Sequence, residues 1–435
     1  MPSFRQPGTV VTDHVIEVPL DHAVPGGEQI QLFAREVVAT EHAPGPGLGQ
    51  GRDDLRWLLF LQGGPGRPSP RPSGREHWLD RALREYRVLL LDQRGTGRST
   101  PANRLTLARL GTPQAQAQYL AHFRADSIVA DAEVIRQRLA GGRPWSVLGQ
   151  SFGGFCTVTY LSQAPDGLAE AFITGGLPAL DATADEVYQA TYPLVAEKNQ
   201  AHYARYPADA EQARRIARHL ADRDVALPSG APLTVEAFQA LGISLGMSTG
   251  SHQLHYLLDD AFEGDELGDD FLYRAQAQLT FAGGPLYAAL HEACYAQAGA
   301  TNWAAHRVRE QFSQFDARAA LDSSGPVLFT GEMIYPWMFA NDPLLRPLAE
   351  AAELLAGRED WPPLYDAAQL SANQVPVAAA VYHDDMYVPR QFSLDTAARI
   401  RGLSRWVTSE YEHDGLRVSN GTVLDRLIGM ARGAI

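Results

Sequence analysis

The chain has 435 residues, of which 45% are hydrophobic and 20% are charged, and this balance excludes disordered and collagen-like classes. Its length suggests two or three domains, or one large domain that carries an insertion. The formal net charge of -14 argues against a surface built for nucleic acid or for an anionic membrane.

Cysteine content and hydropathy restrict the class further. Cys156 and Cys294 are the only two cysteines, so neither a disulfide framework nor a zinc-finger spacing can be drawn. The first residues lack a signal-peptide core, and no stretch approaches the roughly 20 apolar residues of a membrane helix. We therefore expect a cytoplasmic protein without a membrane or nucleic-acid partner. The sequence does not indicate an oligomeric state.

The first part of the chain reads as strands alternating with helices. Residues 9–38 alternate apolar and polar positions and predict an antiparallel strand pair, and the Gly/Pro-rich stretch 40–54 predicts a loop. A helical pattern covers Ser127–Leu139. Apolar runs typical of strands buried on both faces occur at Trp57–Leu61, Tyr86–Leu91 and Trp145–Leu148. This alternation predicts an α/β fold with a mainly parallel, doubly wound sheet.

A long helical insertion follows. From about Leu180 to Asp322 the patterns are helical, with no run of buried-strand type, and predict an all-helical cap. The patterns after it are strands at Pro326–Glu332 and Val375–Asp385, a helical stretch, a short strand at Ser404–Ser409 and a helix at Gly421–Arg432. We therefore predict a core formed by residues 1–178 and 326–435, interrupted by a cap at 179–325.

The stretch GQSFG, residues 149–153, places Ser151 between the apolar run that ends at Leu148 and a helical pattern at Phe155–Leu161. In a nucleophile elbow, G-x-S-x-G holds the serine hydroxyl above the sheet at a strained strand-to-helix turn. A glycine-rich turn that contains a serine by chance is the alternative for the motif taken alone.

The loop QGGPG, residues 62–66, follows the first buried strand. Glycines there expose backbone N–H groups that can stabilise an oxyanion, and the residue after the nucleophile, Phe152, supplies the second donor in such enzymes. A tight turn that needs glycine is the alternative. The position upstream of an elbow favours the oxyanion loop.

The stretch DQRGTGRST, residues 92–100, lacks the third glycine of a dinucleotide fingerprint, and Pro101 prevents a helix from opening directly behind it. We expect Asp92 and Arg94 to fix this loop. His383 beside two aspartates is the nearest approach to a metal site, but strand alternation separates their directions. The sequence thus predicts no metal and no organic cofactor.

A serine nucleophile needs a base and an acid, in the chain order Ser, Asp or Glu, His. His413 lies in a polar loop after the last short strand. Asp384 and Asp385 both lie at the carboxyl end of a strand, where open sheets place their sites. Neighbouring residues of an extended chain point in opposite directions, so only one of the two can face His413.

The motifs QGGPG, DQRGTGRS, GQSFGG, DDMYVP and EHDG occur in this order over residues 58–415. In this combination the chain resembles proline iminopeptidases (prolyl aminopeptidases) of the α/β-hydrolase superfamily. The resemblance implies an α/β-hydrolase fold with a cap, and a serine exopeptidase that releases an N-terminal residue, preferably proline, from short peptides with a free N-terminus.

The resemblance also assigns roles to residues. The triad would be Ser151, Asp385 and His413, with Asp385 chosen because it precedes Pro389 by four residues as in the family pattern. The oxyanion donors would be Gly64 and Phe152. The family binds the substrate amine with cap-side glutamates, which points to Glu332 in TGEMIYPW and, as a candidate second acid, to Glu292.

The chain departs from the family pattern at two positions: Gln62 replaces the usual histidine before GGPG, and Phe152 replaces the usual tryptophan after the nucleophile. The cap and the substrate pocket are therefore the least transferable parts. An esterase or amidase that uses the same triad, and an inactive hydrolase fold that serves as a binding module, are the alternatives.

Overall fold

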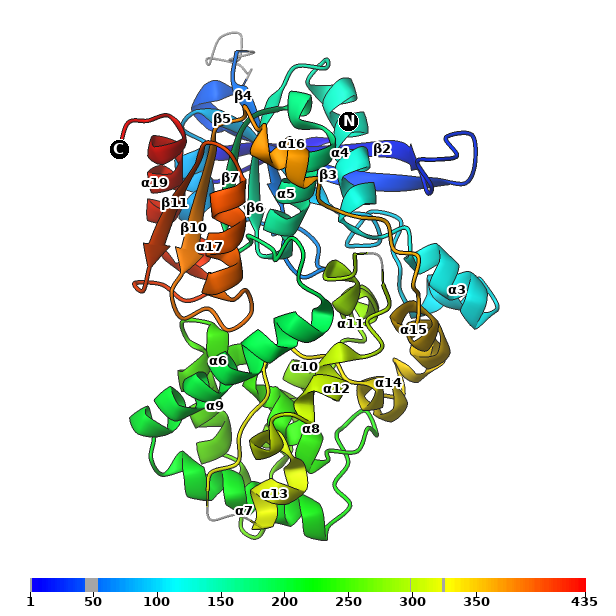
Figure 1. Ribbon diagram of the computed structural model, residues 1–435, viewed down its shortest axis with the longest axis vertical. Coiled ribbons are helices and arrows are strands. Elements are labelled where there is room, and N and C mark those ends of the chain that lie inside the picture. Colours follow the sequence, from blue (N-terminus) through cyan, green and yellow to red (C-terminus); the bar gives the residue numbers. More distant parts are fainter. Residues whose placement is uncertain (1, 44–53, 298, 323–324) are drawn as a thin grey trace.

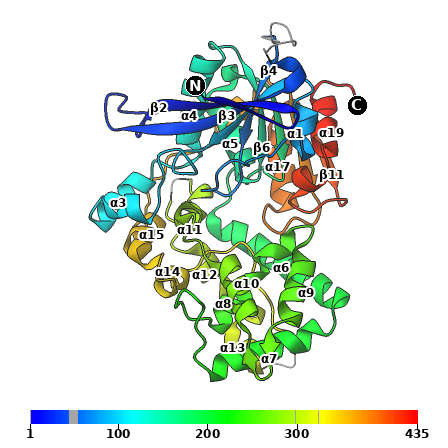
Figure 2. The same cartoon turned by 180° about the vertical axis from the view of Figure 1, so that it is seen from behind.

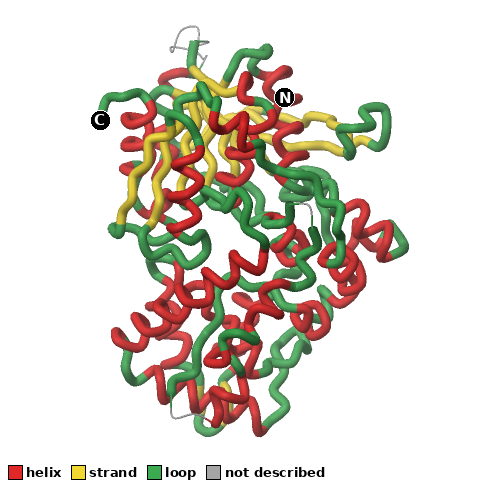
Figure 3. Tube along the Cα trace, viewed as in Figure 1, coloured by secondary structure: helices red, strands yellow, loops and turns green. Residues whose placement is uncertain are grey.

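The computed structural model describes residues 2–43, 54–297, 299–322 and 325–435. Strands gather in one half of the molecule and helices fill most of the other half (Figures 1, 2 and 3). The predicted α/β fold with a mainly parallel sheet is therefore confirmed. The Gly/Pro loop predicted at 40–54 lies largely outside the described residues.

The described strands form one large sheet of nine strands in the order β1-β2-β3-β5-β4-β6-β7-β10-β11. β1, β2 and β3 pair antiparallel, as do β3 and β5, and every other neighbouring pair in this sheet is parallel. The strands are β1 (Ser3–Gln6), β2 (Thr9–Pro19), β3 (Gln29–Ala39), β4 (Arg56–Leu61), β5 (Tyr86–Asp92), β6 (Trp145–Gln150), β7 (Leu168–Thr174), β10 (Val377–Tyr382) and β11 (Leu403–Thr408).

Helices cover both faces of the sheet, which explains its continuous apolar strands. Along β4, Leu59 packs into the core on one face, whereas Leu58 and Phe60 pack into the core on the other. The first face is covered by α4 (Ala125–Leu139), α5 (Phe152–Gln163) and α17 (Arg390–Arg399), and the second by α1 (His77–Ala82) and α19 (Thr422–Ala431). Each fully buried leucine in these layers contributes about 1.5–3 kcal/mol.

Among its described residues, the insertion consists mainly of helices and also contains a short hairpin, β8 (Phe262–Glu263) and β9 (Glu266–Leu267). The prediction of an all-helical unit was therefore wrong at this point, because strands of two residues leave no apolar run to detect. The helices are α6 (Ala184–Arg205), α7 (Asp209–Asp222), α8 (Val235–Gln239), α9 (Gly250–Asp259), α10 (Asp269–Leu279), α11 (Pro285–Leu290), α12 (Ala304–Arg309) and α13 (Ala317–Asp322).

The strand predicted at Pro326–Glu332 does not form, although all seven of these residues are described. Side chains and backbone of the cap take the place of a neighbouring strand. Asn199 bonds both the N–H and the carbonyl of Phe329, and the carbonyl of Gln239 accepts from the N–H of Thr330. The apolar run is thus buried as an extended segment inside the cap, because its backbone hydrogen bonds are satisfied there.

Further helices follow before the chain rejoins the sheet at β10. In Figures 1 and 2, α14 (Pro336–Asn341) and α15 (Ala349–Ala356) lie beside α11 and α12. The boundary predicted at 325 stays a prediction. The remaining helices are α2 (Arg104–Ala108), α3 (Pro113–Leu120), α16 (Ala367–Ser371) and α18 (Gly415–Val418). Within the described part of the chain, none of the helices has both the length and the apolar composition needed to cross a bilayer.

The loop after β5 is held by the two charged residues expected to fix it. Asp92 accepts from the backbone N–H groups of Ser69 and Arg98 and pairs with Arg71. Arg94 is fully buried against Asp131 and donates to backbone carbonyls of Leu20 and His122. Both residues have a structural role, as expected.

Glycine allows α5 to approach the strands closely. A Cβ on Gly153 would overlap the carbonyl oxygen of Leu61 at the end of β4, and one on Gly149 would overlap the carbonyl of Gly153. Both glycines of the elbow are therefore required by contact between backbones.

We expect Gly153→Ala to lower the free energy of unfolding by about 1–3 kcal/mol, because overpacking forces the backbone apart. The matched control is Gly26→Ala, where a Cβ would meet nothing within 4 Å. Urea unfolding of the two variants and the wild type measures the difference. Equal stability of both variants would contradict this account of the elbow.

Candidate active site

Ser151 has the strained backbone of a nucleophile elbow. Its φ of 56 and ψ of -125 lie in a region that non-glycine residues rarely occupy. The turn is held because the Ser151 N–H donates to the carbonyl of Thr174, 3.0 Å away, and its own carbonyl accepts from Gly154. The hydroxyl therefore stands at the carboxyl edge of the sheet, between β6 and α5.

His413 and Asp385 form a buried pair beside this turn. Nδ1 of His413 donates to Oδ2 of Asp385 at 2.7 Å, and Oδ1 accepts from the backbone N–H groups of Tyr387 and Val388. Asp384, by contrast, is 57% exposed and bonds His383. Of the two adjacent acids, Asp385 is thus the one that faces His413.

The environment of His413 raises its pKa. Burial opposes the charged imidazolium, but the carboxylates of Asp385 and Glu332 together outweigh burial and the repulsion from Arg417. The ring of Tyr387 packs edge-on against the imidazole, with centroids 4.8 Å apart, and the backbone N–H of His413 donates to Gly246 of the cap. His413 is therefore positioned by both halves of the molecule.

A cavity of about 450 Å³ brings these groups together. Ser151, His413 and Glu332 all line it. Further walls come from the core residues Gln150, Tyr387 and Arg417, from the loop after β4 and from the cap. The loop and the cap contribute Gln62, Gly63, Gly64, Arg67, Pro68, Gln278, Phe281, Tyr287 and Met247, among others. The loop packs directly on the nucleophile, since a Cβ on Gly63 would lie 2.8 Å from the Cβ of Ser151.

Glu332 presents a carboxylate to this cavity without a cationic partner among the described residues. Its side chain is 18% exposed, and Oε1 accepts from the hydroxyl of Tyr287. Nε2 of His291 lies 4.0 Å from Oε2, but burial lowers the pKa of His291, which keeps the imidazole neutral. A partly buried carboxylate of this kind is suited to a positively charged ligand.

Glu292 is not brought to the cavity. Its two carboxylate oxygens accept from the backbone N–H groups of Ala304 and Ala305, each at 2.9 Å, at the start of α12. Burial raises the pKa of Glu292 to about 7. The structure therefore places this acid at a helix start, away from Ser151 and His413.

Comparisons with known proteins identify the family of the chain. Residues 56–261 match the α/β hydrolase fold family. A proline iminopeptidase of Aeromonas sobria is 51% identical over 420 residues, which cover 96% of each chain. Proline iminopeptidase aneH of Aspergillus aculeatus is 35% identical over 431 residues, or 96% of this chain and 93% of that protein.

This chain belongs to the proline iminopeptidase family. It is therefore a hydrolase built on the α/β-hydrolase fold. A solved structure of a proline iminopeptidase-related protein from Thermus thermophilus is also similar, at 15% identity and a TM-score of 0.39, over 97% of this chain and 98% of that one.

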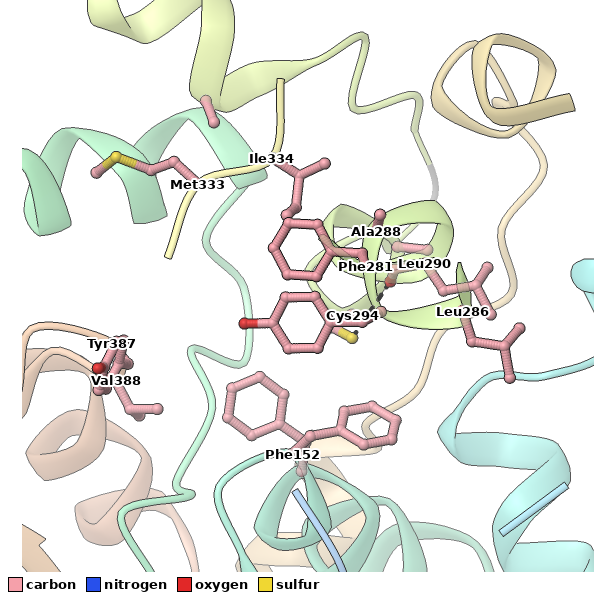
Figure 4. Close-up of a cluster of buried hydrophobic side chains, with 14 of the residues drawn as sticks. Phe152, Phe281, Leu286, Ala288, Leu290, Cys294, Met333, Ile334, Tyr387 and Val388 are labelled. Atoms are coloured by element: carbon pink, nitrogen blue, oxygen red, sulfur yellow. Dashed lines mark hydrogen bonds between the residues drawn. The ribbon is translucent and has the colours of Figure 1, made fainter. Parts of the chain in front are cut away.

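Several residues of the cavity wall were not predicted from the sequence. Tyr287 and Phe281 form a stacked aromatic wall, with ring centroids 5.0 Å apart, and the Arg67 guanidinium lies 5.4 Å from the ring centre of Tyr287. Figure 4 shows Phe152, from the start of α5, facing Phe281 and the cap. Rings at positions 287, 291 and 295 recur at helical spacing, a signal that could have marked this wall.

The pair of acids after β10 gives a direct test of the electrostatics. We expect Asp385→Asn to lower the pKa of His413, because the carboxylate that stabilises its imidazolium is removed. Asp384→Asn is the matched control and should leave the pKa of His413 unchanged. Proton NMR titration of the His413 ring measures both. An unchanged titration in Asp385→Asn would refute the pairing.

Proposed function

We propose that this protein is a serine exopeptidase that releases N-terminal proline from short peptides through an acyl-enzyme. The observation that carries the proposal is the single cavity lined by Ser151, His413 and Glu332, which supplies a nucleophile, a base and an acceptor for an amine. Two relatives that are named proline iminopeptidases and match nearly the whole chain support the same activity.

Acylation starts at the base. Because Nδ1 of His413 is bonded to Asp385, Nε2 is the nitrogen left to accept a proton. It takes the hydroxyl proton of Ser151 as Oγ attacks the carbonyl carbon of the first residue. Asp385 stays ionised and stabilises the imidazolium that forms, which agrees with the raised pKa of His413.

The tetrahedral intermediate carries a negative oxygen that needs hydrogen-bond donors. The N–H of Phe152 belongs to the first turn of α5, where helix N–H groups have no intrahelical acceptor. The N–H of Gly64 belongs to the loop that packs on Ser151. We assign both as oxyanion donors, and each such donor is worth about 10²–10³-fold in rate.

Collapse of the intermediate breaks the peptide bond. The protonated His413 gives its proton to the leaving amine, and the prolyl group stays as an ester on Ser151. A water molecule then attacks this ester while His413 accepts its proton, and proline leaves with the serine hydroxyl restored. The step consumes one water for each peptide bond and needs no other reactant.

Glu332 accounts for action at a free N-terminus. Its carboxylate binds the secondary ammonium of proline, and a blocked N-terminus would leave the negative charge desolvated and unpaired, which is costly. The adjacent wall of Phe281 and Tyr287 offers apolar surface to the pyrrolidine ring. We assign the amine to Glu332 and not to Glu292, whose oxygens are occupied by Ala304 and Ala305.

A proline arylamide and its N-acetylated counterpart test the function. We expect the wild type to cleave only the free-amine compound, and Ser151→Ala to reduce kcat by about 10⁴-fold or more. Labelling of Ser151 by a fluorophosphonate is the parallel measurement of nucleophile reactivity. Equal cleavage of both compounds would instead indicate an amidase that ignores the amine.

The amine anchor has a separate test. Glu332→Gln keeps the size of the side chain but removes the charge, so kcat/KM for the proline arylamide should fall about 100-fold, as expected for breaking a buried ion pair. The exposed Glu350→Gln is the matched control and should retain wild-type kcat/KM. Unchanged activity in Glu332→Gln would show that the amine binds elsewhere.

A further inference from the structure

The catalytic cavity is lined by two arginines as well as by Glu332, and one of them, Arg417, lies close in sequence to His413. Arg417 lies in α18, four residues after His413, and is exposed on the cavity wall. It also lines a neighbouring cavity of about 480 Å³, so solutes can reach its side chain from two sides. Its guanidinium has no hydrogen-bond or ion-pair partner among the described residues.

The acids closest to Arg417 in the chain bind other residues. Asp414, three residues before it, accepts from the backbone N–H and the hydroxyl of Ser248 at 3.0 and 2.6 Å. Glu412 binds Lys198 at 2.6 Å, and Asp385 binds His413. Neither Asp414 nor Glu412 forms an ion pair with Arg417, so its guanidinium is free to bind an acid of a ligand.

The positive charge of Arg417 disfavours protonation of the His413 imidazole in the free enzyme. The His413 imidazole contacts Asp385 and the ring of Tyr387, and it shares the cavity with the charged groups Glu332 and Arg417. The two carboxylates raise the pKa of His413, whereas Arg417 lowers it. An anion supplied by the substrate would cancel this repulsion at the moment when the imidazolium forms.

We propose that Arg417 binds the C-terminal carboxylate of a short peptide, so that di- and tripeptides with a free carboxylate are the preferred substrates. The proposal rests on the proposed exopeptidase function. A peptide is a zwitterion, and the cavity offers Glu332 for its ammonium and Arg417 for its carboxylate. The planar guanidinium matches a carboxylate with two parallel hydrogen bonds, which a neutral C-terminal amide cannot accept in the same way.

The dipeptide Pro-Gly and its C-terminal amide, Pro-Gly-NH2, form the test pair, because both carry the same amine and the same scissile bond. We expect the wild type to show a kcat/KM about tenfold higher for the acid, and Arg417→Gln to reduce this ratio to about one. Arg417→Lys, which keeps the charge, should retain part of the ratio. The exposed Arg405→Gln on β11 is the matched control and should keep the full ratio.

The pH dependence of kcat/KM separates the effect of the Arg417 charge from a loss of packing, because a loss of packing would not shift the acid limb. In Arg417→Gln the acid limb of kcat/KM for a proline arylamide should shift to higher pH, because removal of a positive charge raises the pKa of His413. An acid limb that stays in place would contradict the proposal.

The two proposals can fail separately. If the wild type cleaves the acid and the amide equally well, or if Arg417→Gln keeps the full ratio, Arg417 is not the carboxylate site and the exopeptidase function stands. If the wild type cleaves neither peptide and no proline arylamide, both proposals are overturned.

Discussion

The close contact between α5 and the strands beside it is the constraint on which the site depends. Because residues 149 and 153 are glycines, the backbone of α5 contacts the backbones of β4 and β6. This contact holds Ser151 at a positive φ, which is a strained conformation for a residue with a side chain. The loop after β4 packs on the same serine. The turn of Ser151 and the loop after β4 are therefore parts of one packed unit.

The parallel sheet places the remaining machinery at the same edge. Asp385 follows β10 and His413 follows β11. β10 pairs with β11 on one side and with β7 on the other, and the last residue of β7 anchors the turn of Ser151. Because the carboxyl ends of parallel strands lie together, residues far apart in the chain become neighbours. The buried hydrogen bond between Asp385 and His413 then gives the base its tautomer and its raised pKa.

The cap forms part of the cavity at the carboxyl edge of the sheet. It contributes the aromatic wall of Phe281 and Tyr287 and carries the segment of Glu332, an acid without a cationic partner among the described residues. Arg417, on the core side, adds the opposite charge. Both halves of the chain thus contribute charged side chains to the cavity that contains Ser151.

The sequence by itself determined the alternating elements of the core, the elbow at Ser151 and the positions of His413 and of the acid pair, because buried strands, glycine turns and chain order are local patterns. It did not determine the conformation of Pro326–Glu332. This segment has the composition of a strand, but it is buried in the cap, where Asn199 and Gln239 bind its backbone. Nor could the sequence separate Asp385 from Asp384 without the family pattern, because the two are alike in residue type, or decide whether Glu292 joins Glu332 as a second acid in the cavity. Tertiary structure decided both, since partners distant in the chain, His413 for one acid and the N–H groups of α12 for another, determine where a carboxylate points.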